Sequence, residues 1–477
     1  MIKDNFISDS KFTKLPPFHL FQRRDFYFLF DIKTSCFYKI EKLAYDFLKL
    51  SLKMEPQKAK QIFFKKNNLP ENEKSSISES IDTLIKNGLF DSPDIKWDDK
   101  SFKKKIQSFN NKTITGLELM LAETCNLSCV YCFCKNQTNH SKSLKLMSKD
   151  TIKQALDFLF AHTTGIKKVQ VNFFGGEPLL NLSGLEFALV YGTSLSKKNK
   201  IQIIWSMTTN ATLITPKVIK LLEKYRIKLM VSLDGPRKIH NAQCPTKDGK
   251  GSYDIVEKKI RLLLNYKIPV SIHCTLTHPL KKLKPILHFF ENFDSKKFEH
   301  VVIEPSINPS GKYTTYDLTE FDYQELKRQE QKILPLFLAR NSKYKYKYFY
   351  DYDKLIKRIL QKPTKPFFDS VRCGVIPQSL NVGVNGDIFP CNRFSSMDNW
   401  KVGNIFTGID ITFYHKFWVK NREILKKVCS KCWACNICRG PCPSEMSTST
   451  GEFISPKRCQ YLKDHIENTA FYLMMRE

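Results

Sequence analysis

Between residues 115 and 318, short apolar runs alternate with longer stretches of mixed polarity. Runs rich in branched and aromatic residues predict buried strands, and apolar positions three and four apart predict helices that cover them. Six strand–helix units in series predict an α/β fold with a parallel sheet or an open barrel, and with chemistry at the carboxyl ends of the strands. The predicted strands are Leu117–Leu121, Val169–Phe174, Ile201–Met207, Lys228–Leu233, Val270–Thr275 and His300–Glu304, and the helices between them include Ser148–Phe160, Pro216–Tyr225 and Tyr253–Leu264.

The first part of the chain has a different pattern, in which three short apolar runs precede three helical stretches. A small sheet followed by three helices predicts a winged-helix-like module. Pro56 suits the first position of the second helix, and Gly88 suits the end of the third. The predicted strands are Phe18–Phe21, Asp25–Ile32 and Cys36–Ile40, and the predicted helices are Lys42–Leu52, Pro56–Lys66 and Lys74–Asn87.

At 477 residues the chain is too long for one ordinary core. A polar stretch follows the first module, and the chain beyond Cys373 is dense in cysteine and poor in regular periodicity, so we expect metal to hold that part together. The predicted segments are a winged-helix-like domain at 1–95, a linker at 96–114, a barrel at 115–318, a helical bridge at 319–365 and a cysteine-rich domain at 366–477.

Composition narrows the class of protein. The chain has no apolar run long enough to span a bilayer, and its start lacks the layout of a signal peptide, so we expect a cytoplasmic protein with no membrane partner. Fifteen cysteines in a reducing compartment indicate metal rather than disulfides. The net charge of +30 fits either lysine-rich solvated faces or an acidic partner, and no basic run interleaved with aromatic residues favours nucleic acid.

Three cysteines directly after the first barrel strand carry the strongest signal. Cys125, Cys129 and Cys132 have the spacing C-x3-C-x2-C. Three thiolates on one tight loop can hold three corners of a 4Fe–4S cluster and leave the fourth iron open to chelate a small molecule. A zinc site, or three unrelated thiols, is the alternative interpretation.

This loop, with the aromatic Tyr131 before its last cysteine, resembles the cluster loop of the radical SAM enzymes, whose open iron binds S-adenosylmethionine (AdoMet). The resemblance implies a partial (β/α)6 barrel. The run Gly175-Gly176-Glu177-Pro178 after the second strand resembles the element with which that family holds the methionine amine of AdoMet. Two glycines also allow close approach of the backbone to a ligand.

Further contacts with AdoMet are implied by the same resemblance. Asn210, Ser232 and Asp234 follow the third and fourth strands and would serve the ribose and carboxylate of AdoMet, and the adenine would lie near Tyr131 and Phe133. Serine and asparagine at strand ends also commonly cap helices. Among other candidates, we expect Cys244 to behave as a small buried apolar residue and His240 to have a structural role.

The C-terminal cysteines resemble the SPASM extension of peptide-modifying radical SAM enzymes. The resemblance implies two auxiliary 4Fe–4S clusters, for a total of three. A pair of zinc knuckles is the alternative. Cys429, Cys432, Cys438 and Cys459 would ligate one auxiliary cluster, and Cys373, Cys391 and Cys442 would hold three corners of the other, nearer one.

Two departures from that family bear on the chemistry. With three cysteine ligands the nearer auxiliary cluster has an open iron for a substrate thiolate, unless the additional Cys435 closes it. Anaerobic sulfatase maturases have an aspartate base directly after the cysteine that matches Cys391. Asn392 occupies this position here and cannot act as a base. The sequence therefore argues against formylglycine formation as the main reaction.

The first module resembles the leader-recognition domain of maturases that modify ribosomally made peptides. In that family a leader peptide adds a strand to the third strand, here Cys36–Ile40, and lies against the third helix, here Lys74–Asn87. A winged-helix packing or DNA-binding module is the alternative.

Together the resemblances imply a radical SAM maturase that forms thioether cross-links in a precursor peptide, with flavodoxin or ferredoxin as the type of electron donor. Carbon–carbon cross-linking and side-chain oxidation of the formylglycine type are alternative reactions. An iron–sulfur redox sensor that binds DNA is the alternative from another class.

Overall fold

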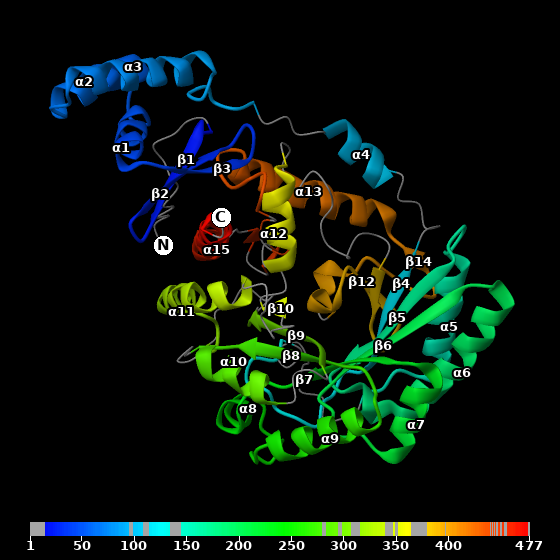
Figure 1. Cartoon of the computed structure of the whole chain (residues 1–477). Helices are drawn as coiled ribbons and strands as arrows, with labels where there is room; N and C mark the ends of the chain where they lie inside the picture. The colour runs from blue at the N-terminus through cyan, green and yellow to red at the C-terminus, as the bar shows by residue number, and fades with distance from the viewer. Residues whose placement is uncertain are drawn as a thin grey trace.

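The computed structural model shows a partial barrel with a cysteine-rich segment and an N-terminal sheet packed above it (Figure 1). It describes residues 15–94, 99–107, 114–133, 145–278, 283–293, 298–306, 315–338, 347–348, 352–363, 379–395, 397–438, 440, 442, 444, 447–448, 451–452 and 456–475.

Six parallel strands in sequence order form the centre of the main sheet. Each predicted strand is present and agrees with its predicted bounds to within a few residues. Alternate residues along the strands point to opposite faces: in β5, Val169, Val171 and Phe173 are buried under the outer helices, while Gln170 and Asn172 line the interior. The strands are β4 (Gly116–Ala122), β5 (Lys168–Gly175), β6 (Gln202–Thr209), β7 (Lys228–Ser232), β8 (Val270–Leu276) and β9 (Phe298–Pro305).

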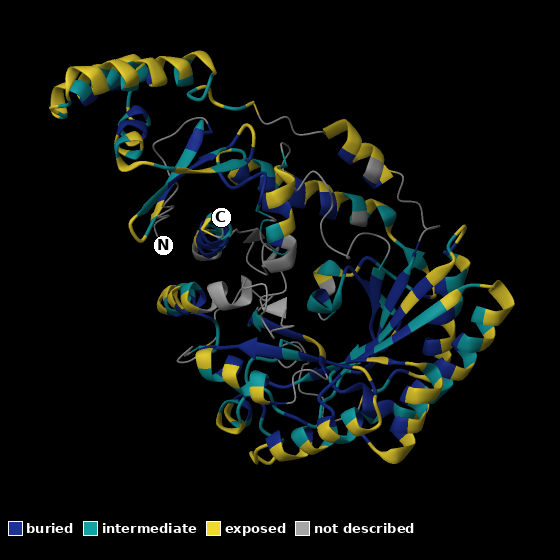
Figure 2. Cartoon of the chain, viewed as in Figure 1, coloured by how far each residue is buried: buried dark blue, intermediate teal, exposed yellow. Residues whose placement is uncertain are grey.

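Helices cover the outer face of these strands (Figure 1). Their first turns have the expected signals: the Ser148 side chain accepts from Thr151 N, and Thr215 caps a helix that has proline at its first position. Figure 2 shows their inner faces buried and their outer faces exposed. The helices are α5 (Lys149–Ala161), η1 (Pro178–Asn181), α6 (Leu182–Asn199), α7 (Pro216–Tyr225), α8 (Arg237–Gln243), α9 (Tyr253–Asn265) and α10 (Leu283–Asn292).

Short strands extend the sheet at both edges. β10 pairs with β9 in parallel, and β11 pairs with β4 in parallel before three antiparallel strands complete an eleven-stranded sheet. The chain therefore returns after the barrel and places its cysteine-rich part beside the first barrel strand. These elements are α11 (Glu320–Leu338), β10 (Lys347–Tyr348), α12 (Tyr352–Gln361), β11 (Ser379–Val382), β12 (Asp387–Phe389), β13 (Gly403–Asn404) and β14 (Gly408–Ile409).

The cysteine-rich segment continues through two short helices and one long helix, and it ends on a second long helix that is largely buried. In the part of the chain that the structure describes, no helix combines the length and apolar character needed to cross a membrane. The remaining elements are η4 (Asn392–Phe394), η5 (Asp398–Trp400), α13 (Ile411–Cys429), β15 (Ser447–Thr448), β16 (Gly451–Glu452) and α15 (Pro456–Met474).

The N-terminal module has the predicted order of three strands and three helices. Its sheet is antiparallel in the order β1-β2-β3, so β3 lies at an edge. Phe18 and Leu29 on one face pack with Phe47 and Phe63 of the helices. The elements are β1 (Phe18–Arg23), β2 (Phe26–Asp31), β3 (Cys36–Ile40), α1 (Lys42–Ser51), α2 (Pro56–Lys66) and α3 (Glu71–Lys86).

The other face of this small sheet packs against the cysteine-rich segment. The His19 ring stacks on Trp433 with centroids 3.8 Å apart, and Asn436 Nδ2 donates to the carbonyl of Ile32. Phe28 contacts Phe471 of α15 edge to face. The module is therefore joined to the C-terminal part by buried contacts as well as by the chain.

The segment predicted as a linker, residues 96–114, contains a helix, α4 (Asp99–Gln107). Its two apolar residues, Phe102 and Ile106, are buried, and the Arg422 guanidinium of α13 lies over the Phe102 ring. Asp99 at the first turn accepts from Arg422 and Lys426. Two apolar residues in nine give too little periodicity to predict a helix from the sequence. The helix is stabilised mainly by its contacts with α13, which lies far along the chain.

Candidate active site

The loop that carries Cys125, Cys129 and Cys132, here called the cluster loop, begins at the end of β4. It runs across the carboxyl ends of the neighbouring strands. Ser128 N and Val130 N donate to the carbonyls of Pro245 and Gln243, so the loop is tied to the end of α8. Cys132 N donates to the carbonyl of Cys129, which closes a turn between two of the predicted ligands. Cys125, Cys129 and Cys132 are all half-buried.

The Cys125 thiol lies among hydrogen-bond donors. Leu127 N is 3.4 Å from its sulfur, and Asn210 Nδ2 is 3.5 Å from it. Burial raises the pKa of this thiol to about 12, and the thiols of Cys129 and Cys132 act in the same direction. N–H groups aimed at sulfur suit a thiolate, and a bound cation supplies the charge that burial alone disfavours. The donor set therefore fits an iron–sulfur cluster.

A buried network supports the loop from below. The Tyr131 hydroxyl donates to Asp234 Oδ2 at 2.9 Å, and Thr275 N donates to Asp234 Oδ1 at the same distance. Cys244 Sγ lies 3.3 Å from the Tyr131 hydroxyl and 2.7 Å from Cys129 Sγ. Asp234 is fully buried, so its carboxylate is engaged by the protein itself.

His240 completes this network, in the structural role predicted for it. Its Nδ1 accepts from Asp234 N at 3.2 Å, and its Nε2 lies 3.0 Å from Ser252 Oγ. Burial lowers the pKa of His240, which keeps the ring neutral as these contacts require. Cys244 was predicted as a merely apolar residue. It is buried, but its sulfur also contacts that of Cys129, a predicted cluster ligand.

The Gly-Gly loop approaches the cluster loop very closely. A Cβ on Gly175 would lie 2.3 Å from the carbonyl oxygen of Ala122, and one on Gly176 would lie 2.1 Å from that of Thr124. Gly175 also has a φ of +141°, which disfavours other residues. Gly176 N and Glu177 N donate to the same two carbonyls, so only glycine fits this contact.

The Glu177 side chain is turned toward the protein interior. Its carboxylate accepts from Leu179 N, from Thr209 Oγ1 at 2.7 Å and from Asn210 N at 2.8 Å. It is fully buried, and burial raises its pKa to about 7. The carboxylate thus links the Gly-Gly loop to the end of β6, and the backbone carbonyls of this loop remain the candidates for an ammonium group.

The other predicted AdoMet contacts lie on the same rim. Asn210 bonds to Asn126 Oδ1 at 3.0 Å as well as to Cys125, and therefore also supports the cluster loop. Ser232 is the last residue of β7 and is half-buried, as is Phe133. Pro178 is buried at the start of η1.

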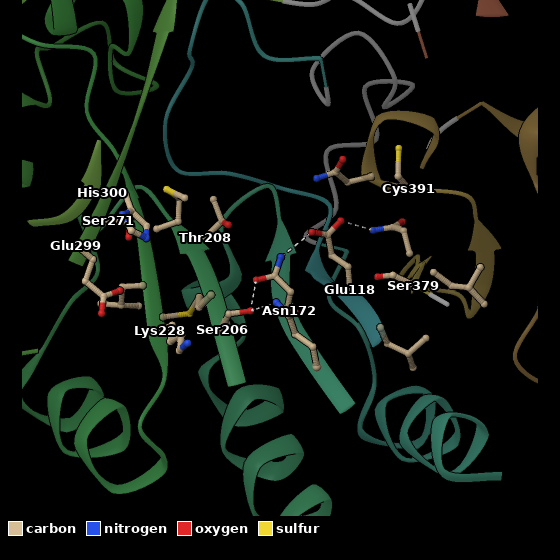
Figure 3. A pocket seen from close by; sticks show the side chains of 18 of the residues that line it. Glu118, Asn172, Ser206, Thr208, Lys228, Ser271, Glu299, His300, Ser379 and Cys391 are labelled. Atoms are coloured by element: carbon tan, nitrogen blue, oxygen red, sulfur yellow. Dashed lines mark hydrogen bonds between the residues drawn. The ribbon is translucent and has the colours of Figure 1, made fainter. Parts of the chain in front are cut away.

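A cavity of about 490 Å³ occupies the interior of the barrel (Figure 3). Its lining comes from the inner faces of β4 to β9 and from β11, with Pro390, Cys391 and Asn392 of the cysteine-rich segment. The cavity thus lies between the barrel strands and the cysteine-rich segment.

Glu118, which was not among the predicted site residues, lies in the wall of this cavity. Asn172 Nδ2 donates to its Oε2 at 2.6 Å, and Asn381 Nδ2 donates to its Oε1 at 3.1 Å. Ser206 Oγ donates to Asn172 Oδ1 and extends the chain of hydrogen bonds to β6. Burial outweighs both donors and raises the pKa of Glu118 to about 7.

The C-terminal cysteines form one clear group. Burial, together with the thiols of four neighbouring cysteines, raises the pKa of Cys429 well above its usual value. Cys435 is one of these four and packs in an apolar cluster with Cys429 and, at its edge, Cys459. This group contains Cys429, Cys432, Cys435, Cys438 and Cys459.

The predicted ligands of the nearer auxiliary cluster are described in part. Cys391 lines the barrel cavity, and Cys442 Sγ lies 3.1 Å from Ser444 Oγ. Cys373 falls outside the described residues.

A three-cysteine loop at the rim of a partial (β/α)6 barrel, joined to a glycine-rich loop and to a cysteine-rich extension, defines an enzyme of the AdoMet-dependent iron–sulfur class. The family model of the radical SAM superfamily matches residues 119–290. The chain thus contains a radical SAM domain and is a radical SAM enzyme, and this kind of domain implies a 4Fe–4S cluster and AdoMet as cofactors.

Known relatives support this assignment. The cysteine-type anaerobic sulfatase-maturating enzyme of Clostridium perfringens strain 13 is 27% identical over 333 residues, which cover 67% of this chain and 85% of that protein. The structure of anSMEcpe with bound AdoMet covers 76% of this chain and 98% of its own, with a TM-score of 0.62 and 23% identity. Streptococcus suis SuiB bound to precursor peptide SuiA covers 93% of this chain and 99% of its own, with a TM-score of 0.52 and 16% identity.

Proposed function

We propose that this enzyme modifies a ribosomally made precursor peptide and joins its cysteine thiols to carbon atoms as thioethers. The cavity is the observation that supports this proposal. Strands of the barrel form one wall of the cavity, and Cys391 with Asn392 forms another. A peptide segment in the cavity has a reacting carbon on the barrel side and a thiol on the side of the auxiliary cysteines. The names of the relatives agree with a peptide substrate.

Cys125, Cys129 and Cys132 hold the first cluster, and the carbonyls of the Gly-Gly loop take the ammonium of AdoMet. When bound, cluster and AdoMet together supply the radical that removes a hydrogen atom from the peptide. The chain contributes binding, orientation and exclusion of water. Tyr131 and Asp234 act here by fixing the loop, since their contacts are made within the protein.

The cysteine-rich segment holds two auxiliary clusters. Cys435 lies with Cys429 and Cys459, which supports its assignment to the farther group. Three thiols then remain for the nearer cluster, namely Cys373, Cys391 and Cys442, and one iron stays available to a substrate thiolate. A flavodoxin or ferredoxin supplies the electrons.

The leader of the precursor binds at the N-terminal sheet. β3 is an edge strand, and Tyr38 on it is 46% exposed. An extended peptide can add a fourth strand there by main-chain hydrogen bonds. The net charge of +30 suits a leader rich in acidic residues.

Mass spectrometry of a cysteine-rich precursor, co-expressed with the chain under anaerobic conditions, tests this function. We expect the loss of two hydrogen atoms per cross-link and thiols that no longer react with an alkylating reagent. The matched control is Cys125→Ala, which should leave the peptide unmodified. A modified peptide whose thiols all stay alkylatable would contradict thioether formation.

Side-chain oxidation of the formylglycine type is the second candidate, favoured by the similarity to sulfatase-maturating enzymes over 333 residues. The same spectra separate the two reactions, because oxidation of cysteine to formylglycine removes its sulfur whereas a thioether keeps it. Carbon–carbon cross-linking also removes two hydrogen atoms but leaves the thiols alkylatable.

A further inference from the structure

We propose that Glu118 accepts the proton that the substrate thiol releases when it becomes the thiolate that is later joined to carbon. This inference rests on the proposed thioether chemistry and assigns a base to it. By the resemblance given above, Asn392 stands where the sulfatase maturases carry an aspartate base, and Glu118 lines the same cavity on the side next to the segment that carries Cys391.

The fold directs Glu118 into the cavity. It is the third residue of β4 and lies between Leu117 and Leu119, which are both buried. Figure 3 shows its carboxylate pointing into the cavity between Asn172 and the segment that carries Cys391. The amides of Asn172 and Asn381 each hold one carboxylate oxygen, so its position is fixed.

One buried polar atom next to Glu118 has no hydrogen bond. Asn381 lines the same cavity and is fully buried, and its Oδ1 has no hydrogen-bond partner among the described residues, although its Nδ2 bonds to Glu118. A buried acceptor without a partner costs free energy, so this end of the cavity is not arranged for stability alone.

Other titratable groups line the cavity but are less suited to the task. Lys228, Glu299 and His300 are exposed and lie on the β7 and β9 side of Figure 3, away from Cys391. Glu118 is sheltered, and burial raises its pKa to about 7, which is the range in which a carboxylate is an effective base at neutral pH. Cys391 is itself assigned to the nearer cluster.

The reaction balances with Glu118 in this role. The thiol S–H and a carbon C–H bond break, and one S–C bond forms. The hydrogen of carbon leaves as an atom to the adenosyl group of cleaved AdoMet, and the hydrogen of sulfur leaves as a proton to Glu118. The one remaining electron passes to an iron–sulfur cluster of the C-terminal cysteines.

Glu118→Gln tests this role, because it keeps the shape of the side chain and removes its basicity. With a peptide deuterated at the reacting carbon, we expect deuterium to enter 5′-deoxyadenosine at the wild-type rate while cross-link formation falls about 100-fold or more. Glu223→Gln on the exposed face of α7 is the matched control and should change neither rate. Equal cross-linking by wild type and Glu118→Gln would overturn the proposal, as would an equal loss of deuterium transfer and cross-linking, which indicates a structural role.

Two further measurements separate a base from a structural residue. The wild-type cross-linking rate should decline below about pH 7, and this inflection should vanish in Glu118→Gln. Infrared difference spectra should show a carboxyl band that titrates in the same range in wild type and is absent from the variant.

A double variant gives a separate test. Restoring an aspartate in Glu118→Gln/Asn392→Asp should recover part of the rate, and no recovery together with an unchanged pH profile would contradict the proposal. Absence of any cross-link with wild type would instead refute the proposed function itself.

Discussion

The Tyr131 hydroxyl of the cluster loop donates a hydrogen bond of 2.9 Å to Oδ2 of Asp234, which lies just beyond the end of β7. Asp234 also accepts from Thr275 N of β8, so one buried carboxylate ties the loop to two strands. By resemblance to the family, Asp234 was expected to contact AdoMet. Its observed partners indicate that it holds the loop, and its contact with AdoMet stays a prediction.

Replacing Asp234 by alanine should therefore destabilise the loop rather than weaken AdoMet binding alone. The loss of buried charge-assisted hydrogen bonds costs about 2–4 kcal/mol. We expect a lower iron and sulfide content after reconstitution and faster cluster loss in the presence of a chelator. Asp254→Ala, which removes an exposed ion pair with Arg237, is the control and should keep the wild-type content. Full iron content with weakened AdoMet binding would show that Asp234 contacts the ligand.

The close approach of Gly176 to the cluster loop gives a second prediction. In Gly176→Ala the new Cβ would meet the Thr124 carbonyl at 2.1 Å, so one of the two loops must shift. We expect AdoMet binding to weaken by about tenfold or more, because the Gly-Gly loop and the cluster move apart. Equilibrium dialysis with labelled AdoMet under anaerobic conditions measures the change.

Gly383→Ala is the appropriate control for this variant. A Cβ at Gly383 would have its nearest neighbour at 3.7 Å, an ordinary contact. This variant should bind AdoMet as wild type does. Equal binding by both variants would indicate that the two loops adjust without cost.

The apolar pattern predicts the barrel well because each strand is long enough to bury several residues against a helix. The same reasoning misses α4, where Phe102 and Ile106 find their partners on α13, far along the chain. It also misses β10 and the hairpins of the cysteine-rich part. Strands of two to four residues are too short to show an alternating apolar pattern. Whether they form depends on pairing with strands that are distant in the sequence.

The predicted rim residues do meet at one end of the barrel, because the carboxyl ends of parallel strands share an edge. The motifs could not reveal which of these side chains form hydrogen bonds within the protein, as Glu177 and Asp234 do. Glu118 was missed although a signal was present. A glutamate inside the otherwise apolar strand Gly116–Ala122 has an energetic cost that calls for a function.

A third prediction concerns the edge strand of the N-terminal sheet. If a leader with acidic residues pairs with β3, Tyr38→Asp should weaken leader binding by about tenfold through repulsion and lost contact area. Val190→Asp on α6, where the residue is 62% exposed, introduces the same charge far from the sheet and serves as control. Fluorescence anisotropy of a labelled leader measures both, and equal affinities would place the leader elsewhere.

The last prediction follows from the contact between Cys129 and Cys244, whose sulfur atoms lie 2.7 Å apart. If Cys129 binds iron as proposed, Cys244 stays a thiol beside it. When air destroys the cluster, molecular oxygen can oxidise the two thiols, and little movement is needed to join them. We expect peptide mapping of air-exposed protein, without reductant, to show a disulfide between these two cysteines. Such a bond removes one of the three ligands, so reconstitution with iron and sulfide should fail until a thiol reductant is added.

Cys244→Ser is the control for this prediction. After the same exposure, Cys129 should not be joined to residue 244 and should be reducible to a free thiol, and reconstitution should recover more cluster than in the wild type. A link from Cys129 to Cys125 or Cys132 in the wild type would contradict this pairing.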